Sequence, residues 1–142
     1  MEGKTYQLGR LTIAFKRVEG EGESSYSIVE SIEPTGSGAG RHRHETFQET
    51  FIVLEGNYDF EVGDETRSVG PGDILVIPRG MPHGFKCTSP TPGRLMTIST
   101  PAGVFEAFIA DVCASSIDSG TPDGGVAVDM RAIASRHGVE FG

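Results

Sequence analysis

Cysteines and long apolar runs are both scarce in this sequence of 142 residues, and each scarcity excludes a class of protein. Cys87 and Cys113 lack the dense, even spacing of a secreted disulfide framework, so we expect two free thiols. No apolar run approaches the roughly twenty residues that span a bilayer, and the first ten residues lack the basic-then-apolar layout of a signal peptide. We therefore expect a cytoplasmic protein without a membrane partner.

Basic residues are also few. Twelve lysines and arginines stand against twenty aspartates and glutamates, which gives a formal net charge of −8 at pH 7. A chain of this charge repels the phosphate backbone, so we expect no nucleic-acid partner. The length fits one domain, which can bury a core without disulfides or metal ions.

Short runs of β-branched and aromatic residues are plentiful, and each run predicts a strand. The predicted strands cover residues 11–18, 26–32, 50–54, 58–62, 66–69, 74–77, 83–87 and 94–100. Glycines and prolines lie between these runs, as in the Gly-Pro-Gly-Asp turn of residues 70–73. About eight strands within about ninety residues favour a closed or two-sheet β fold.

The pattern changes after Pro101, where apolar residues recur at helical spacing from Val104 to Val112. We predict a helix here, with Thr100 as its N-cap and Pro101 at its first position. Residues 115–125 are typical of a linker, and 129–137 predict a short helix that Gly138 ends. We expect residues 1–114 to form the β domain with its first helix, and 115–142 to pack on the same domain.

Three histidines and one glutamate form the candidate metal site. His42 and His44 are separated by one residue, so both face the same side of a strand. Glu49 has the wrong parity for that face, and a bend within 45–48 must turn it inward. His83 follows the turn at 78–80, which could return the chain from the opposite side of the barrel. Alternatively, His42 and His44 belong to a solvated polar loop.

Imidazole nitrogens and a carboxylate oxygen suit several divalent metal ions, namely Fe, Mn, Ni, Co, Cu and Zn. Four protein ligands leave one or two coordination positions open for water or substrate. The sequence therefore permits metal-dependent chemistry at this site.

The order of residues around these ligands resembles the two motifs of the cupin superfamily. The first motif is matched by Gly36, His42, His44, Glu49 and Gly56. The second is matched by Gly72, Pro78, Gly80 and His83, whereas Cys87 stands where the family usually has Asn. The ending from Thr100 to Phe141 is also similar to the small single-domain cupins labelled quercetin 2,3-dioxygenase-like.

This resemblance implies an all-β fold, the double-stranded β-helix or jelly-roll barrel, with one or two short C-terminal α-helices. It implies one divalent metal ion on His42, His44, Glu49 and His83, with Glu49 also catalytic as a general base. It also implies a homodimer, formed through sheet edges or an exchanged N-terminal strand.

The resemblance further suggests a dioxygenase-like oxidoreductase that acts on a small enolic, phenolic or catecholic molecule. A non-oxidative cupin isomerase, lyase or cyclase would use the same site, and so would a cupin that binds a small molecule without turnover.

Strand parity suggests which side chains contact the substrate. The candidates are Phe51 and Val53 on the strand of Glu49, Phe85 and Cys87 on the strand of His83, Met96 and Ile98 on the last strand, and Phe105 on the helix. Each of these residues could instead belong to the core. The resemblance suggests that the helix lies over the barrel mouth as a lid, but the helix could instead cover a sheet face or a dimer contact. His137 lies at a predicted helix end, where capping explains it without a metal ion.

Overall fold

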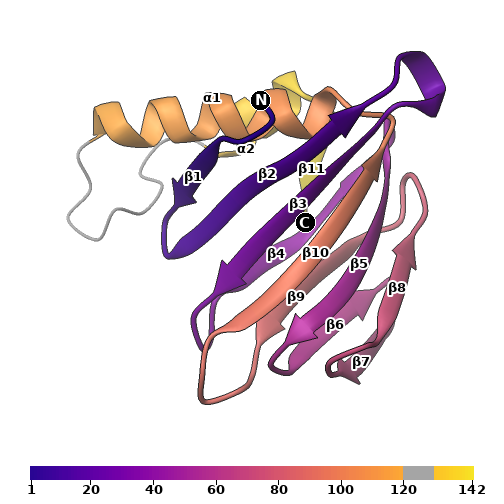
Figure 1. Ribbon diagram of the computed structural model, residues 1–142, viewed down its shortest axis with the longest axis vertical. Helices are drawn as coiled ribbons and strands as arrows, with labels where there is room; N and C mark the ends of the chain where they lie inside the picture. The colour runs from indigo at the N-terminus through magenta and orange to yellow at the C-terminus, as the bar shows by residue number, and fades with distance from the viewer. Residues whose placement is uncertain (120–129) are drawn as a thin grey trace.

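Alternating buried and exposed side chains build two antiparallel sheets (Figure 1). The computed structural model describes residues 1–119 and 130–142. In spatial order, the six-stranded sheet contains β1 (Thr5–Leu8), β2 (Leu11–Glu19), β3 (Tyr26–Glu33), β10 (Gly93–Thr100), β5 (Gln48–Glu55) and β8 (Ile74–Ile77). The five-stranded sheet contains β11 (Val139–Phe141), β4 (Gly38–His44), β9 (His83–Cys87), β6 (Tyr58–Val62) and β7 (Glu65–Val69).

The inner faces of the two sheets enclose a hydrophobic core. In β10, for example, Leu95, Thr97 and Ser99 are buried, whereas the residues between them are partly exposed. The core cluster between the sheets consists of Phe51, Val53, Tyr58, Phe60, Leu75, Ile77, Cys87 and Leu95. This arrangement is a double-stranded β-helix, which confirms the predicted fold class.

Two helices cover one end of the sheets. Figure 1 shows α1 (Val104–Ser119) lying across the strand ends beside β1, and α2 (Met130–Arg136) follows it in the chain. Phe108, Ile109 and Val112 of α1 pack in one cluster with Ile13 and Phe15 of β2. The same cluster contains Ile133 and Ala134 of α2 and Val139 of β11. The helix thus packs against the inner face of the six-stranded sheet, which is one of the roles predicted for it.

All eight predicted strands are present, with ends that shift by one or two residues. β4 supplies the strand on which the pairing of His42 and His44 depends. Three of the described strands lie outside the eight predicted ranges. β4 was expected only through the parity of His42 and His44. β1 and β11 were not predicted, because runs of four and three residues give too little alternation to detect.

The predicted start of the first helix is wrong. Thr100 is the last residue of β10, and α1 begins at Val104. The backbone N–H of Gly103 donates a hydrogen bond to the Glu106 carboxylate, three residues further on. This is the glutamate half of a capping box, and it sets the start of the helix after Gly103.

The predicted linker is also partly wrong, since residues 115–119 belong to α1. Between Gly103 and Gly120 the sequence has no glycine or proline to break the helix. Residues 120–125 of the predicted linker lie outside the described residues, as does Asp129 at the predicted start of the second helix. That helix ends at Arg136, and Gly138 follows with a positive φ of 73°, as predicted.

Among the described residues, neither helix has the length and apolar character that crossing a membrane requires.

Candidate metal centre

His42 and His83 lie directly opposite each other on β4 and β9 of the five-stranded sheet. Their ring centroids are 4.3 Å apart. The two strands approach so closely that position 38 has room only for glycine. A Cβ on Gly38 would lie 1.9 Å from the backbone oxygen of Phe85. The sequence suggested that His83 returns from the opposite side of the barrel, but it comes from the strand beside His42.

Glu49 comes from the other sheet. β4 ends at His44 and β5 begins at Gln48, so the intervening residues make the predicted bend and bring Glu49 inward. Phe47 anchors this bend, since its side chain is buried and its ring stacks on the His44 imidazole at 3.7 Å and 7°. The two sheets therefore supply the candidate ligands from opposite walls.

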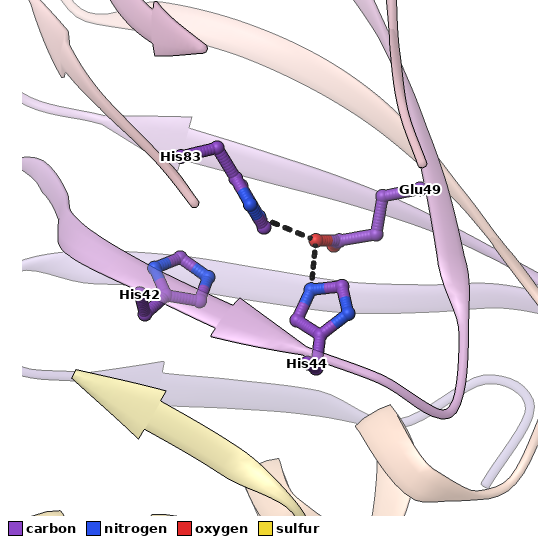
Figure 2. A group of neighbouring side chains, drawn as sticks. All are labelled: His42, His44, Glu49 and His83. Carbon is purple, nitrogen blue, oxygen red and sulfur yellow. Dashed lines mark hydrogen bonds and ion pairs between the residues drawn. The ribbon is translucent and has the colours of Figure 1, made fainter. Parts of the chain in front are cut away.

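The four side chains converge on one point, as Figure 2 shows. Their four candidate ligand atoms all lie within 4.8 Å of one another. Oε1 of Glu49 is 2.7 Å from Nε2 of His44 and 3.0 Å from Nε2 of His83. His44, Glu49 and His83 are buried, and His42 is half-buried.

Backbone carbonyls fix the orientation of all three imidazoles. The distances from Nδ1 to carbonyl oxygen are 2.7 Å for His42 to Gly40, 2.9 Å for His44 to Phe47 and 2.8 Å for His83 to Met81. A carbonyl oxygen can only accept a hydrogen bond, so each Nδ1 carries a proton and donates it. In the neutral rings, Nε2 is then left with a lone pair for a metal ion.

The donor set fits a divalent cation. The Nε2 lone pairs of His44 and His83 would repel the Glu49 carboxylate at the observed distances unless a cation lies between them. That cation is either a proton on the imidazole or a metal ion. Three imidazole nitrogens and one carboxylate oxygen are ligands that first-row transition metals accept.

The site also favours the protonation states that a metal requires. Burial and the neighbouring His83 lower the pKa of His42 to about 4, so this ring is neutral at pH 7. Burial would raise the pKa of Glu49, but hydrogen bonding to His44 and His83 outweighs it and lowers the pKa to about 2. Glu49 is therefore a carboxylate at neutral pH.

A cavity of about 820 Å³ reaches this group, and His42 and Glu49 form part of its wall. Part of the remaining wall is aromatic, with Phe51 and Phe85 from the sheets and Phe105 and Phe108 from α1, and other lining residues are polar or charged, such as Arg41 and Glu61. A small molecule in the cavity would therefore meet apolar rings and two of the candidate ligands.

Three of the seven predicted substrate contacts line the cavity, namely Phe51, Phe85 and Phe105. Val53 and Cys87 belong to the core cluster between the sheets. Both cysteines are free and buried, as expected. Phe51 both lines the cavity and belongs to that core cluster, and Phe85 lines the cavity and packs against the cluster.

The expectation that Met96 and Ile98 face the substrate is corrected by the structure, because both residues lie on the outer face of the six-stranded sheet. The cavity residue on β10 is Thr97, which the sequence interpretation missed. Apolar residues of a strand commonly face the interior, but in β10 Met96 and Ile98 face outward, whereas Thr97 and Ser99 face inward. Thr97 shares its side of the strand with Leu95, whose burial only the structure shows, so the sequence gave no signal for Thr97.

His137, the remaining histidine, is not part of the candidate ligand group. Its Nε2 lies 3.0 Å from Oδ2 of Asp111, and its backbone N–H donates to the oxygen of Ala134 at the end of α2. Its position at a helix end agrees with the capping interpretation.

Comparisons with known proteins agree with the fold. The family described as Cupin domain matches residues 28–99, which include all four candidate ligands. Quercetin 2,3-dioxygenase from Bacillus subtilis (strain 168) is 30% identical over 102 residues, which are 72% of this chain and 28% of that protein. An uncharacterized protein from Methanocaldococcus jannaschii is 32% identical over 75 residues, 53% of this chain and 60% of that protein.

Among solved structures, KdgF from Halomonas sp. matches with a TM-score of 0.62 at 18% identity. The match covers 72% of this chain and 92% of that one. At this identity the likeness concerns the fold. The chain spans less than two thirds of the length of either curated relative.

Proposed function

Because the chain belongs to the cupin domain family, we propose that it is a metal-dependent, dioxygenase-like enzyme that acts on a small enolic, phenolic or catecholic molecule. The observation that carries this proposal is the convergence of His42, His44, Glu49 and His83 beside a cavity that His42, Glu49 and several phenylalanines line. The similarity to quercetin 2,3-dioxygenase over 72% of the chain supports the oxidative form of this chemistry.

His42, His44, His83 and Glu49 would hold the ion, which is one of Fe, Mn, Ni, Co, Cu and Zn. When bound, a divalent ion supplies Lewis acidity, which favours loss of the proton from an enol or phenol. The backbone carbonyls of Gly40, Phe47 and Met81 keep the imidazoles oriented, so little reorganisation accompanies binding.

The cavity supports an aromatic or enolic substrate. Phe51, Phe85, Phe105 and Phe108 offer ring faces and edges to a flat molecule, and aromatic pairs gain from offset or edge-to-face contact. The cavity volume of about 820 Å³ lies in the range of about 300 to 1,000 Å³ that small-molecule sites occupy.

Glu49 would accept the proton that the substrate hydroxyl loses. In the metal-free protein, hydrogen bonding to His44 and His83 lowers the pKa of Glu49 to about 2, so a carboxylate held in these contacts is a weak base at neutral pH. We therefore propose that the carboxylate leaves these contacts to act as a base and returns to them afterwards. A glutamine at this position would keep the size of the side chain but lose the base.

The first test is elemental analysis of protein purified without a histidine tag. We expect about one equivalent of a divalent metal in the wild type and a large loss in His83→Ala. His137→Ala is the matched control, because this histidine lies outside the ligand group and should leave the metal content unchanged. Equal metal content in all three proteins would contradict the assignment.

The second test uses an oxygen electrode with a panel of enols, phenols and catechols. We expect oxygen consumption by the metal-loaded wild type and a loss of about 100-fold or more in Glu49→Gln, because a general base typically contributes about 100-fold to 10,000-fold. Product formation under anaerobic conditions would instead favour an isomerase, lyase or cyclase. No product with any compound would count against an enzyme.

Cytoplasmic location stays a prediction from the sequence.

A further inference from the structure

Two serine hydroxyls beside the candidate metal centre have no hydrogen-bond partner. Ser27 of β3 and Ser99 of β10 both have 0% exposure, and the hydroxyl oxygen of each is buried without forming a hydrogen bond. A buried hydroxyl gives up its hydrogen bonds to water on folding, so most such groups regain one inside the protein. These two hydroxyls are therefore free to bind a polar group that comes within reach.

The strand register places the two hydroxyls in one row with Glu49. Ser99 lies directly opposite Glu49 of β5, and Ser27 lies directly opposite Ser99. All three side chains are buried on the inner face of the six-stranded sheet. Side chains in such cross-strand pairs have Cβ atoms about 4.5 to 5.5 Å apart. Because a glutamate carboxyl group lies beyond Cβ and Cγ, rotation of the Glu49 side chain can bring its oxygens to the Ser99 hydroxyl.

The other neighbours of Glu49 on this face are apolar or more distant. Ile77 pairs with it from β8, and Phe51 is the next inward residue of its own strand. Thr97, the next inward residue of β10, is diagonal to Glu49, at a separation of about 7 to 8 Å. Of the two side chains paired directly with Glu49, Ser99 is thus the one that offers a hydrogen-bond donor.

The Glu49 carboxylate does not contact Ser99 in the structure. Figure 2 shows it directed at His44 and His83, whose Nε2 atoms lie 2.7 and 3.0 Å from its Oε1. A carboxylate that leaves these two contacts within a buried site needs another donor, because an unpaired buried charge is costly. A serine hydroxyl donates one hydrogen bond and can accept others, so Ser99 can donate to Glu49 while it accepts from Ser27.

We propose that Ser99, supported by Ser27, is the positioning residue that receives the Glu49 carboxylate when this carboxylate acts as a base. The inference rests on the proposed function, in which Glu49 takes the proton of the substrate hydroxyl. The proton moves from that hydroxyl to a carboxylate oxygen, the electron pair of the broken O–H bond stays on the substrate oxygen, and Ser99 keeps its own proton. Glu49 lines the cavity, so the carboxylate held by Ser99 remains beside the substrate.

A crystal structure of the metal-free double variant His44→Ala/His83→Ala tests the contact without an activity measurement. The variant removes both imidazoles that hold the carboxylate, and it retains only two of the four candidate ligands. We expect an oxygen of Glu49 within about 3 Å of the Ser99 hydroxyl oxygen. A carboxylate that points into the cavity, or to any other group, would overturn the proposal.

Steady-state kinetics tests the role in turnover, with the metal-loaded enzyme and the compound of the panel that it oxidises fastest. Ser99→Ala should lower kcat about 10-fold or more, which is the loss expected for one hydrogen bond to a charged group. KM should change less than about twofold, because Ser99 has 0% exposure and does not contact the substrate. The metal content should equal that of the wild type, since Ser99 is not a candidate ligand. Ser99→Thr keeps the hydroxyl and should recover most of the lost kcat.

Ser89→Ala is the matched control, because it also removes a buried serine hydroxyl, at 5% exposure, but beyond the end of β9 that lies away from His83. It should keep the wild-type kcat. A wild-type kcat in Ser99→Ala, or equal losses in Ser99→Ala and Ser89→Ala, would refute positioning by Ser99. If the double variant does not fold, this kinetic comparison decides. A wild type that oxidises no compound would refute the proposed function and the base role with it, whereas the Ser99 contact would still stand or fall by the crystal structure.

Discussion

Phe141, the next-to-last residue, lies directly opposite His42 in the pair formed by β11 and β4. Their ring centroids are 5.8 Å apart, and both residues line the cavity. Phe141 therefore packs against the side chain of His42, which is the least buried of the four candidate ligands.

Phe141→Ala should weaken metal binding more than it weakens the fold. Loss of the ring leaves the His42 imidazole freer to move, and we expect the metal dissociation constant to rise about 10-fold, as is usual for residues that support a ligand. Competition with a chelator measures the constant. Glu140→Gln is the control, because the Glu140 carboxylate points to the exposed Arg43 at 2.8 Å and not to the site. Equal constants for the two variants would refute the buttressing role.

The metal-free protein should lose stability as the pH falls from about 6.5 to about 4. The pKa of His42 is about 4 in the folded chain and about 6.5 in the unfolded chain, so the unfolded chain binds an additional proton in this window. Urea midpoints at pH 7 and pH 5 measure the effect, with the midpoint lower at pH 5. In His42→Ala the difference between the two midpoints should shrink. An unchanged difference would show that His42 is not its source.

A buried hydrogen bond links the two sheets at the opposite end of the core. The Tyr58 hydroxyl donates to Oε1 of Glu33 at 2.6 Å, and both side chains have 0% exposure. Burial raises the pKa of Glu33, although the Ser31 and Tyr58 hydroxyls oppose this shift. The bond therefore serves a carboxyl group that has little access to water.

Tyr58→Phe should lower the free energy of unfolding by about 1 to 3 kcal/mol, because it leaves a buried carboxyl oxygen without its donor. Urea unfolding at constant pH measures the loss. Tyr26→Phe is the matched control, since Tyr26 is 36% exposed and should change stability little. Similar losses in both variants would contradict the importance of the buried bond.

The sequence by itself determined most of the β fold and the candidate ligand set. The turn residues and apolar runs delimited the strands, and the fixed order from Gly36 to His83 identified the cupin motifs. The parity of His42 and His44 placed both on one side of a strand, and the parity of Glu49 required the bend that β4 and β5 show.

Only the tertiary structure decided which strands face each other across the site. Parity tells which residues share a side of a strand, but not which side faces the interior or which strand lies next to it. For this reason the sequence placed His83 on the far wall, whereas it pairs with His42 and Glu49 lies opposite. For the same reason the sequence suggested that Met96 and Ile98 face inward, whereas β10 carries these apolar residues on the face that meets solvent.

The role of Phe141 also required the structure, since 99 positions separate it from His42 in the chain. Such long-range pairs depend on how the sheets close around the core, and local patterns along the sequence carry no record of that closure.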